Sequence, residues 1–295
     1  MPRRPLPSLL PRARLRPRRA LALLALLASL TARPAGADPP PGWADGSGVR
    51  ADVQAGKPLV LYVVVPLCHH DQIDCGDRRA GLPDDLEHNL YWGAIFGARR
   101  FLDRPRSPWT RLGAASGDAR TPERVAYRRL ADGAPWGMAG KTIEQIVVLQ
   151  AFHGDAIDLA VDHFFDVATA GGKVTIPGET PREETIHAAI YAGHNRLMDG
   201  KTLPAARAGA HGIASVVLAC RSEPYWGPAL RAAGSSVMLT TRDLMAPEGY
   251  LIEAVARSLG ANASLPSLRA AAITSGTQWW RLTAAQVGWI FAPPA

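Results

Sequence analysis

The stretch Ile213–Trp226, IASVVLACRSEPYW, decides the predicted fold. Its first half, up to Ala219, is a run of small and β-branched apolar residues. Such continuous runs are typical of a strand buried on both faces of a parallel sheet. Cys220 follows the run directly, and a polar and aromatic segment comes next. Cys220 is therefore predicted to lie where a buried strand ends and a helix begins, which is where open α/β sheets place their ligands and their chemistry.

Segments before and after this stretch show the same alternation of strands and helices. Residues 123–130 fit either a short helix or a strand, and residues 104–120 are rich in turn formers. Alternating strands and helices predict an α/β fold, with one mostly parallel sheet flanked by helices on both faces. The other predicted strands are 58–65, 143–152, 185–192 and 236–241, and the predicted helices are 84–102, 156–170, 224–233, 247–259 and 265–272.

The N-terminal residues have the pattern of a signal peptide. Residues 1–37 contain eight arginines, then the apolar run 20–30, then the small residues 35–37. This order predicts cleavage near Ala37 and export to a periplasm or out of the cell. The apolar run is too short for a stable transmembrane helix, so an uncleaved anchor is the weaker alternative and we expect no membrane association after cleavage. Residues 38–57 are predicted to be a linker and residues 58–295 a single α/β domain.

The basic character of the chain comes from this N-terminal segment. Eight of the 33 Lys and Arg residues lie within residues 1–37, which leaves 25 of them against 26 Asp and Glu residues, a net charge of −1. A near-neutral mature chain gives no indication of a nucleic-acid partner.

Three cysteines make an odd number for an exported protein. Cys68 and Cys75 lie in one polar loop and are predicted to form a disulfide, which leaves Cys220 as a free thiol. The alternative for this loop is a metal-dependent hydrolase. Its spacing matches no familiar zinc pattern, so we predict no metal and no cofactor. The residues that such a metal site would draw on are Cys68, His69, His70, Asp71, Asp74 and Cys75.

Histidines follow three of the predicted strands, as Cys220 follows another, and the first of these are His69 and His70 after the strand at 58–65. His153 ends the strand at 143–152, and Gly193-His194-Asn195 ends the strand at 185–192. The carboxyl ends of parallel strands meet at one edge of a sheet, so these side chains are expected to converge. A neighbouring imidazole lowers the pKa of a thiol and later protonates the leaving group, so His194 and Cys220 are the candidate base and nucleophile.

This pattern resembles the caspase, legumain and gingipain group of cysteine peptidases. In that group a hydrophobic strand ends in His-Gly and the next hydrophobic strand ends in Ala-Cys. This chain has AAIYAGHN (188–195) followed by ASVVLAC (214–220). The resemblance implies a caspase-like three-layer sandwich and an endopeptidase that acts on peptide or protein substrates.

The resemblance also implies roles for single residues. Cys220 would be the nucleophile, His194 the acid and base, and the N–H groups of Cys220 and Asn195 the oxyanion hole. Gly193, Arg221 and Glu223 would flank the cleft, and His153 is a second-choice base.

Two residues depart from the group. Asn195 stands where the group has Gly, and Leu218 stands where many members have an acidic or amide residue. These differences favour the alternative of a non-catalytic exported binding or structural module with the same fold.

Overall fold

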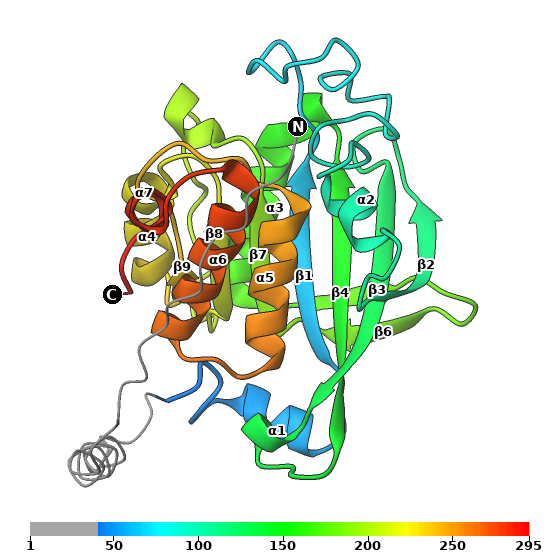
Figure 1. Cartoon of the computed structure of the whole chain (residues 1–295), viewed down its shortest axis with the longest axis vertical. Helices are drawn as coiled ribbons and strands as arrows, with labels where there is room; N and C mark the ends of the chain where they lie inside the picture. Colours follow the sequence, from blue (N-terminus) through cyan, green and yellow to red (C-terminus); the bar gives the residue numbers. More distant parts are fainter. Residues whose placement is uncertain (1–40, 295) are drawn as a thin grey trace, which may run out of the picture. The chain divides into compact units, whose positions relative to one another are not determined.

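A seven-stranded mixed sheet forms the centre of the computed structural model, which describes residues 41–294. The strand order is β2-β3-β4-β1-β7-β8-β9. The five strands β4, β1, β7, β8 and β9 are parallel to one another. At one edge, β3 pairs antiparallel with β4, and β2 pairs antiparallel with β3. The prediction of an α/β fold with a mostly parallel sheet is therefore confirmed (Figure 1). The strands of the sheet are β1 (Leu59–Pro66), β2 (Thr110–Ser116), β3 (Glu123–Asp132), β4 (Thr142–Phe152), β7 (Ala188–Ala192), β8 (Ala214–Leu218) and β9 (Ser236–Leu239).

Helices cover both faces of this sheet. Alternate side chains of β1 point to opposite faces, and all eight residues of the strand are buried. Val60, Tyr62 and Val64 pack in one apolar cluster with residues of α3 and α4. Their neighbours pack in a second cluster with residues of α2, α5 and α6, and Figure 1 shows α5 and α6 in front of the sheet. The helices are α1 (Gly48–Gln54), α2 (Ala98–Leu102), α3 (Ile157–Ala170), α4 (Ser222–Ala232), α5 (Gly249–Gly260), α6 (Leu265–Trp280) and α7 (Ala284–Ile290).

Smaller elements lie in the connections. A two-stranded antiparallel hairpin, β5 (Lys173–Ile176) and β6 (Arg182–Thr185), stands between α3 and β7. Three short 3-10 turns follow β3, β4 and β7, namely η1 (Ala134–Trp136), η2 (Gly154–Ala156) and η3 (Arg196–Asp199).

The helix predicted over residues 84–102 is wrong for most of its length. Only α2 is helical, and residues 84–97 form a series of turns. The amide of Asn89 explains the difference, because it bonds the backbone of Cys68 through both of its polar atoms, at 3.0 and 2.8 Å. Asn89 is fully buried. These contacts tie the segment to the end of β1, in place of the repeating bonds of a helix.

The predicted linker also differs from the structure over residues 41–57. This segment contains α1, and Val53 and Ala44 are buried in the core. The Trp43 indole N–H donates to the Leu259 carbonyl at 2.9 Å, so the segment is part of the folded body. The predicted signal peptide lies outside the described residues.

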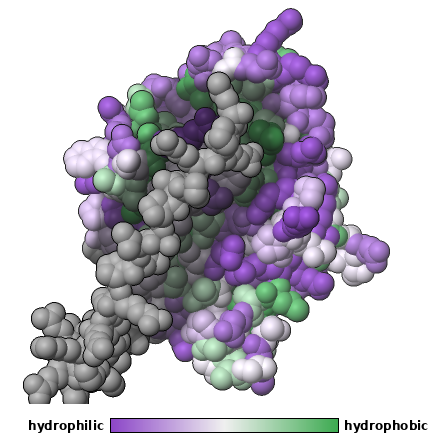
Figure 2. All heavy atoms as spheres, in the orientation of Figure 1, coloured by the Kyte–Doolittle hydropathy of each residue, from purple (hydrophilic) through white to green (hydrophobic). Residues whose placement is uncertain are grey.

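The antiparallel edge of the sheet was predicted less well than its parallel part. Residues 110–116, expected to be turns, form the exposed strand β2, and residues 123–132 form the strand β3. Figure 2 shows mainly hydrophilic residues over the side of the molecule that carries β2 and β3. Between residues 41 and 294, no helix combines the length and the apolar character needed to cross a bilayer.

Candidate functional site

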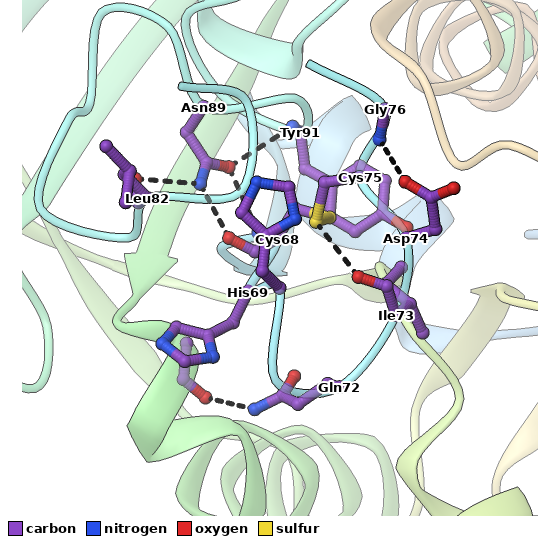
Figure 3. Close-up of a disulfide and its surroundings, with 12 residues drawn as sticks. Cys68, His69, Gln72, Ile73, Asp74, Cys75, Gly76, Leu82, Asn89 and Tyr91 are labelled. Atoms are coloured by element: carbon purple, nitrogen blue, oxygen red, sulfur yellow. Dashed lines mark hydrogen bonds between the residues drawn. A yellow bond between two sulfur atoms is a disulfide. The ribbon is translucent and has the colours of Figure 1, made fainter. Parts of the chain in front are cut away.

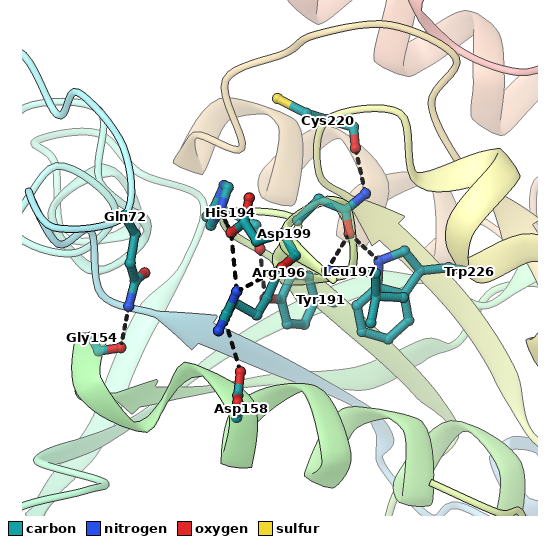
Figure 4. A network of polar contacts seen from close by, with 11 residues as sticks. Gln72, Gly154, Asp158, Tyr191, His194, Arg196, Leu197, Asp199, Cys220 and Trp226 are labelled. Atoms are coloured by element: carbon teal, nitrogen blue, oxygen red, sulfur yellow. Dashed lines mark hydrogen bonds and ion pairs between the residues drawn. The ribbon is translucent and has the colours of Figure 1, made fainter. Parts of the chain in front are cut away.

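The register between β7 and β8 places His194 beside Cys220. The two strands are parallel neighbours, and Ala192 of β7 pairs with Leu218 of β8. His194 and Cys220 each lie two residues beyond this pair, in the loops that leave the sheet at the same edge (Figure 4). Neighbouring strands are about 4.8 Å apart, so the two loops begin side by side. The two predicted residues therefore lie at neighbouring strand ends, and Figure 4 shows the Cys220 sulfur directed away from the His194 ring.

Cys220 lies in a tight corner between β8 and α4. It is the free cysteine of residues 41–294, and it is partly exposed. Arg221 adopts a left-handed conformation with φ of 48°, and α4 begins at the next residue. Non-glycine residues adopt this conformation rarely and at some energetic cost, and such residues cluster at functional sites. The corner holds the thiol at the edge of the sheet.

Asn195 joins the loop after β7 to the loop after β8. Its Nδ2 donates to the Cys220 carbonyl at 2.7 Å, and its Oδ1 accepts from the Trp226 indole N–H at 2.9 Å and from the Leu197 backbone at 3.3 Å. Asn195 is fully buried. A glycine here would leave these buried groups without partners, so the departure from the resembled group has a structural role in this chain.

The His194 ring is held by a carboxylate that the sequence did not single out. Nε2 of His194 lies 2.6 Å from Oδ2 of Asp199, and the side chain of His194 is mostly buried. Arg196 lies 3.5 Å from the same carboxylate. A neutral imidazole that donates through Nε2 keeps Nδ1 free to accept a proton. Within residues 41–294, Nδ1 of His194 has no hydrogen-bond partner.

Gly193 precedes His194 and allows close packing against β1. A Cβ atom at this position would overlap the Pro66 ring at the end of β1. The Tyr191 hydroxyl donates to the His194 carbonyl at 2.8 Å. Backbone and ring of His194 are thus both positioned by neighbouring residues.

The sulfur of Cys220 contacts a third loop. It lies 3.4 Å from both the backbone nitrogen and the carbonyl oxygen of Met245, in the segment between β9 and α5. Among the described residues no hydrogen bond joins this sulfur to His194.

The backbone N–H groups assigned to the oxyanion hole are free. Neither the N–H of Cys220 nor that of Asn195 donates a hydrogen bond to any residue between 41 and 294. Two unpaired donors that flank a thiol at a strand end can stabilise a developing oxyanion.

Arg221 and Glu223, which were predicted to flank the cleft, follow Cys220 at the start of α4. The Arg221 backbone N–H donates to Asp243 at 3.0 Å, and its side chain is exposed. The Glu223 carboxylate accepts from Thr240 and pairs with Arg231, about two turns further along α4. Glu223 therefore stabilises the start of α4.

Two residues that contact His194 or Cys220 were not singled out from the sequence, namely Asp199 and Met245. Burial raises the pKa of Tyr91. Burial also raises the pKa of Glu248. Asp199 could have been suspected as an acidic residue in the loop after His194, whereas Met245 carries no local signal.

Cys68 and Cys75 are joined by a disulfide, as Figure 3 shows. Their sulfurs are therefore not thiolate ligands. Nε2 of His70 bonds the Arg78 carbonyl at 2.9 Å, and His69 Nε2 faces Asp155 at 3.6 Å. Within residues 41–294, no group of three or more His, Cys, Asp or Glu side chains is arranged to hold a metal ion.

The second-choice base, His153, lies away from Cys220. It follows β4, and the strand order separates β4 from β8 by β1 and β7. Three strand spacings amount to about 14 Å. Its Nε2 lies 3.3 Å from Asp84 and its Nδ1 accepts from the Asp155 backbone at 3.3 Å.

Comparison of the chain with protein-family models, with curated proteins and with solved structures finds no match.

Proposed function

We propose that the chain is an exported cysteine endopeptidase with a caspase-like fold, in which Cys220 is the nucleophile and His194 the general acid and base. The single observation that carries the proposal is the β7–β8 register, which brings the two residues to neighbouring strand ends. The chain order, histidine strand first and cysteine strand second, supports the resemblance. Export rests on the signal-peptide pattern of residues 1–37.

The reaction begins with proton transfer from the Cys220 thiol to Nδ1 of His194. The thiolate attacks the substrate carbonyl carbon, and the oxygen takes the negative charge. The free N–H groups of Cys220 and Asn195 donate to this oxygen. The His194 imidazolium then protonates the leaving amine, which breaks the peptide bond and leaves a thioester. Water hydrolyses the thioester, releases the acid product and restores the thiol.

Asp199 positions the imidazole for these steps. Its carboxylate accepts from Nε2 at 2.6 Å, so it keeps the proton on that nitrogen and stabilises the imidazolium that forms. For the dyad to form, the Cys220 sulfur must leave its contacts with the Met245 backbone and make a hydrogen bond to Nδ1 of His194. The segment between β9 and α5 must therefore shift when substrate binds.

The test uses the mature chain with fluorescently labelled casein and a peptide library. We expect cleavage by the unaltered protein, at least 1000-fold less by Cys220→Ala and His194→Ala, and a 10- to 100-fold loss with an altered pH profile in Asp199→Asn. His88→Ala is the matched control, because this exposed histidine pairs with Asp85 in another loop. Full cleavage by Cys220→Ala would refute the proposal.

A non-catalytic binding module of the same fold is the competing proposal. The observation that favours it is the contact of the Cys220 sulfur with the Met245 backbone instead of with the imidazole. Alkylation by iodoacetamide separates the two. The measured quantity is the rate at which iodoacetamide alkylates Cys220, followed across pH. If its pH dependence is the same in His194→Ala as in the unaltered protein, the binding module is favoured. If its pH dependence changes in His194→Ala, the dyad is supported.

A further inference from the structure

A cavity of about 800 Å³ lies beside α5, between this helix, α6 and β3. Neither Cys220 nor His194 lines it, and it extends along α5 from Tyr250 to Gly260. Its volume is within the range of small-molecule sites. Polar side chains of opposite charge line it, and three of these carry the inference: Arg129, Glu253 and Arg257.

Arg129 contributes a guanidinium without an acidic partner. Its Nε donates to the buried Gln145 amide oxygen at 2.6 Å, and its Nη2 donates to the Arg257 carbonyl at 3.4 Å. Within residues 41–294, no carboxylate lies within ion-pair distance of it. Burial and the charge of Arg257 lower the pKa of Arg129, the charge of Glu253 offsets this only in part, and a bound anion would stabilise the charged form further.

Gly260 makes room for this arrangement. A Cβ atom at Gly260 would overlap the amide oxygen of Gln145 and would lie 2.7 Å from Nη2 of Arg129. The end of α5 can therefore pass directly over the guanidinium only because this residue is glycine.

Glu253 contributes the complementary group. Its Oε2 pairs with Arg104 at 2.6 Å, and its side chain is 10 % exposed. Its other oxygen, Oε1, is buried and has no hydrogen-bond partner among the described residues. A buried carboxylate oxygen without a donor is costly, and a ligand N–H or ammonium would satisfy it.

We propose that this cavity binds a free α-amino acid, with the ligand carboxylate on Arg129 and the ligand ammonium on Oε1 of Glu253. A zwitterion satisfies the unpaired cation and the unpaired acceptor together. Phe101, Tyr250 and Trp279 form an aromatic part of the lining, with Tyr250 and Trp279 stacked at 5.6 Å. This wall favours an apolar or aromatic side chain on the ligand.

The proposal is independent of peptidase activity, because the two sites share no residue. Binding is measured by calorimetry on the unaltered protein, with L-phenylalanine and L-leucine as probes. We expect saturable binding of at least one of them. N-acetyl-L-phenylalanine lacks the ammonium and L-phenylalaninamide lacks the carboxylate, so each should bind at least 10-fold more weakly than L-phenylalanine or L-leucine.

Variants locate the site. Arg129→Gln and Glu253→Gln should each weaken binding at least 10-fold, whereas Arg128→Gln should leave it unchanged. Arg128 is the matched control, since it directly precedes Arg129 in β3 and points to the opposite face, 4.0 Å from Glu144. The blocked ligands need no variant and decide the question even where a variant fails to fold. Absence of binding by both amino acids, or equal binding of the blocked analogues, would overturn the proposal.

Discussion

At the scale of single residues, Asn195 determines how the two halves of the candidate site are held. Its side chain bonds the Cys220 carbonyl, the Trp226 indole and the Leu197 backbone. The backbone N–H of the same residue, which we propose as an oxyanion donor, has no hydrogen-bond partner among residues 41–294. One asparagine thus connects the loops after β7 and β8.

Replacement of Asn195 by alanine is expected to destabilise the fold. The change leaves the Cys220 carbonyl and the buried Trp226 N–H without partners, and each such loss costs about 1–3 kcal/mol. We expect urea unfolding to show a decrease of about 2–4 kcal/mol in the free energy of unfolding. Gln278→Ala removes an exposed carboxamide and serves as the control, with a change within about 0.5 kcal/mol. Equal effects of the two variants would contradict this role.

At the scale of elements, His187 links α1, β1 and β7. Its Nδ1 accepts from the Val60 backbone at 3.1 Å, and its Nε2 lies 3.5 Å from Asp52 of α1. The residue is 4 % exposed. Burial lowers its pKa below the ordinary value of 6.5, and the charge of Asp52 offsets this only in part.

This lowered pKa predicts a loss of stability in mild acid. Between the pKa of the folded state and about 6.5, the unfolded chain binds more protons than the folded chain, so the free energy of unfolding falls as the pH falls. The contribution is fully present above this window. Urea unfolding from pH 7.5 to 5 should show the decrease, and His187→Gln should show a smaller one.

His88→Gln is the control for this titration. His88 is exposed and pairs with Asp85, 2.8 Å away. The prediction fails if His187→Gln retains the full pH dependence of the unaltered protein.

At the scale of the whole molecule, residues at the start of the described chain connect two distant parts of the fold. Trp43 donates to Leu259 at the end of α5 and packs edge-on against Trp136, with ring centroids 6.1 Å apart. The Ala44 N–H donates to Asn262 at 3.1 Å. The first described residues therefore join the end of α5 to the turn after β3.

Removal of the Trp43 side chain should lower the stability of the whole body. We expect Trp43→Ala to reduce the free energy of unfolding by about 1–3 kcal/mol, since a partly buried indole and its hydrogen bond are lost. Trp289 is 62 % exposed, so Trp289→Ala should cost less than about 1 kcal/mol. A flexible linker at residues 41–57 would instead give no difference between the two variants.

Local patterns in the sequence determined the strands of the parallel sheet. The apolar runs at β1, β4, β7 and β8 were visible because residues buried on both faces of a parallel sheet are apolar at nearly every position. The short separation of Cys68 from Cys75 likewise pointed to their pairing. The prediction of His194 and Cys220 as a pair also began from local features, namely the residue types at the end of each strand.

The tertiary structure alone decided which strands are neighbours and which side chains meet. Strand order makes β7 adjacent to β8 and separates His153 from Cys220, and no local pattern encodes that order. Asn89 bonds Cys68 from 21 residues away, and so turns a helix-like sequence into a loop. Met245 contacts the thiol from 25 residues away. Burial of apolar residues is a property of each segment, whereas hydrogen-bond partners depend on how distant segments pack.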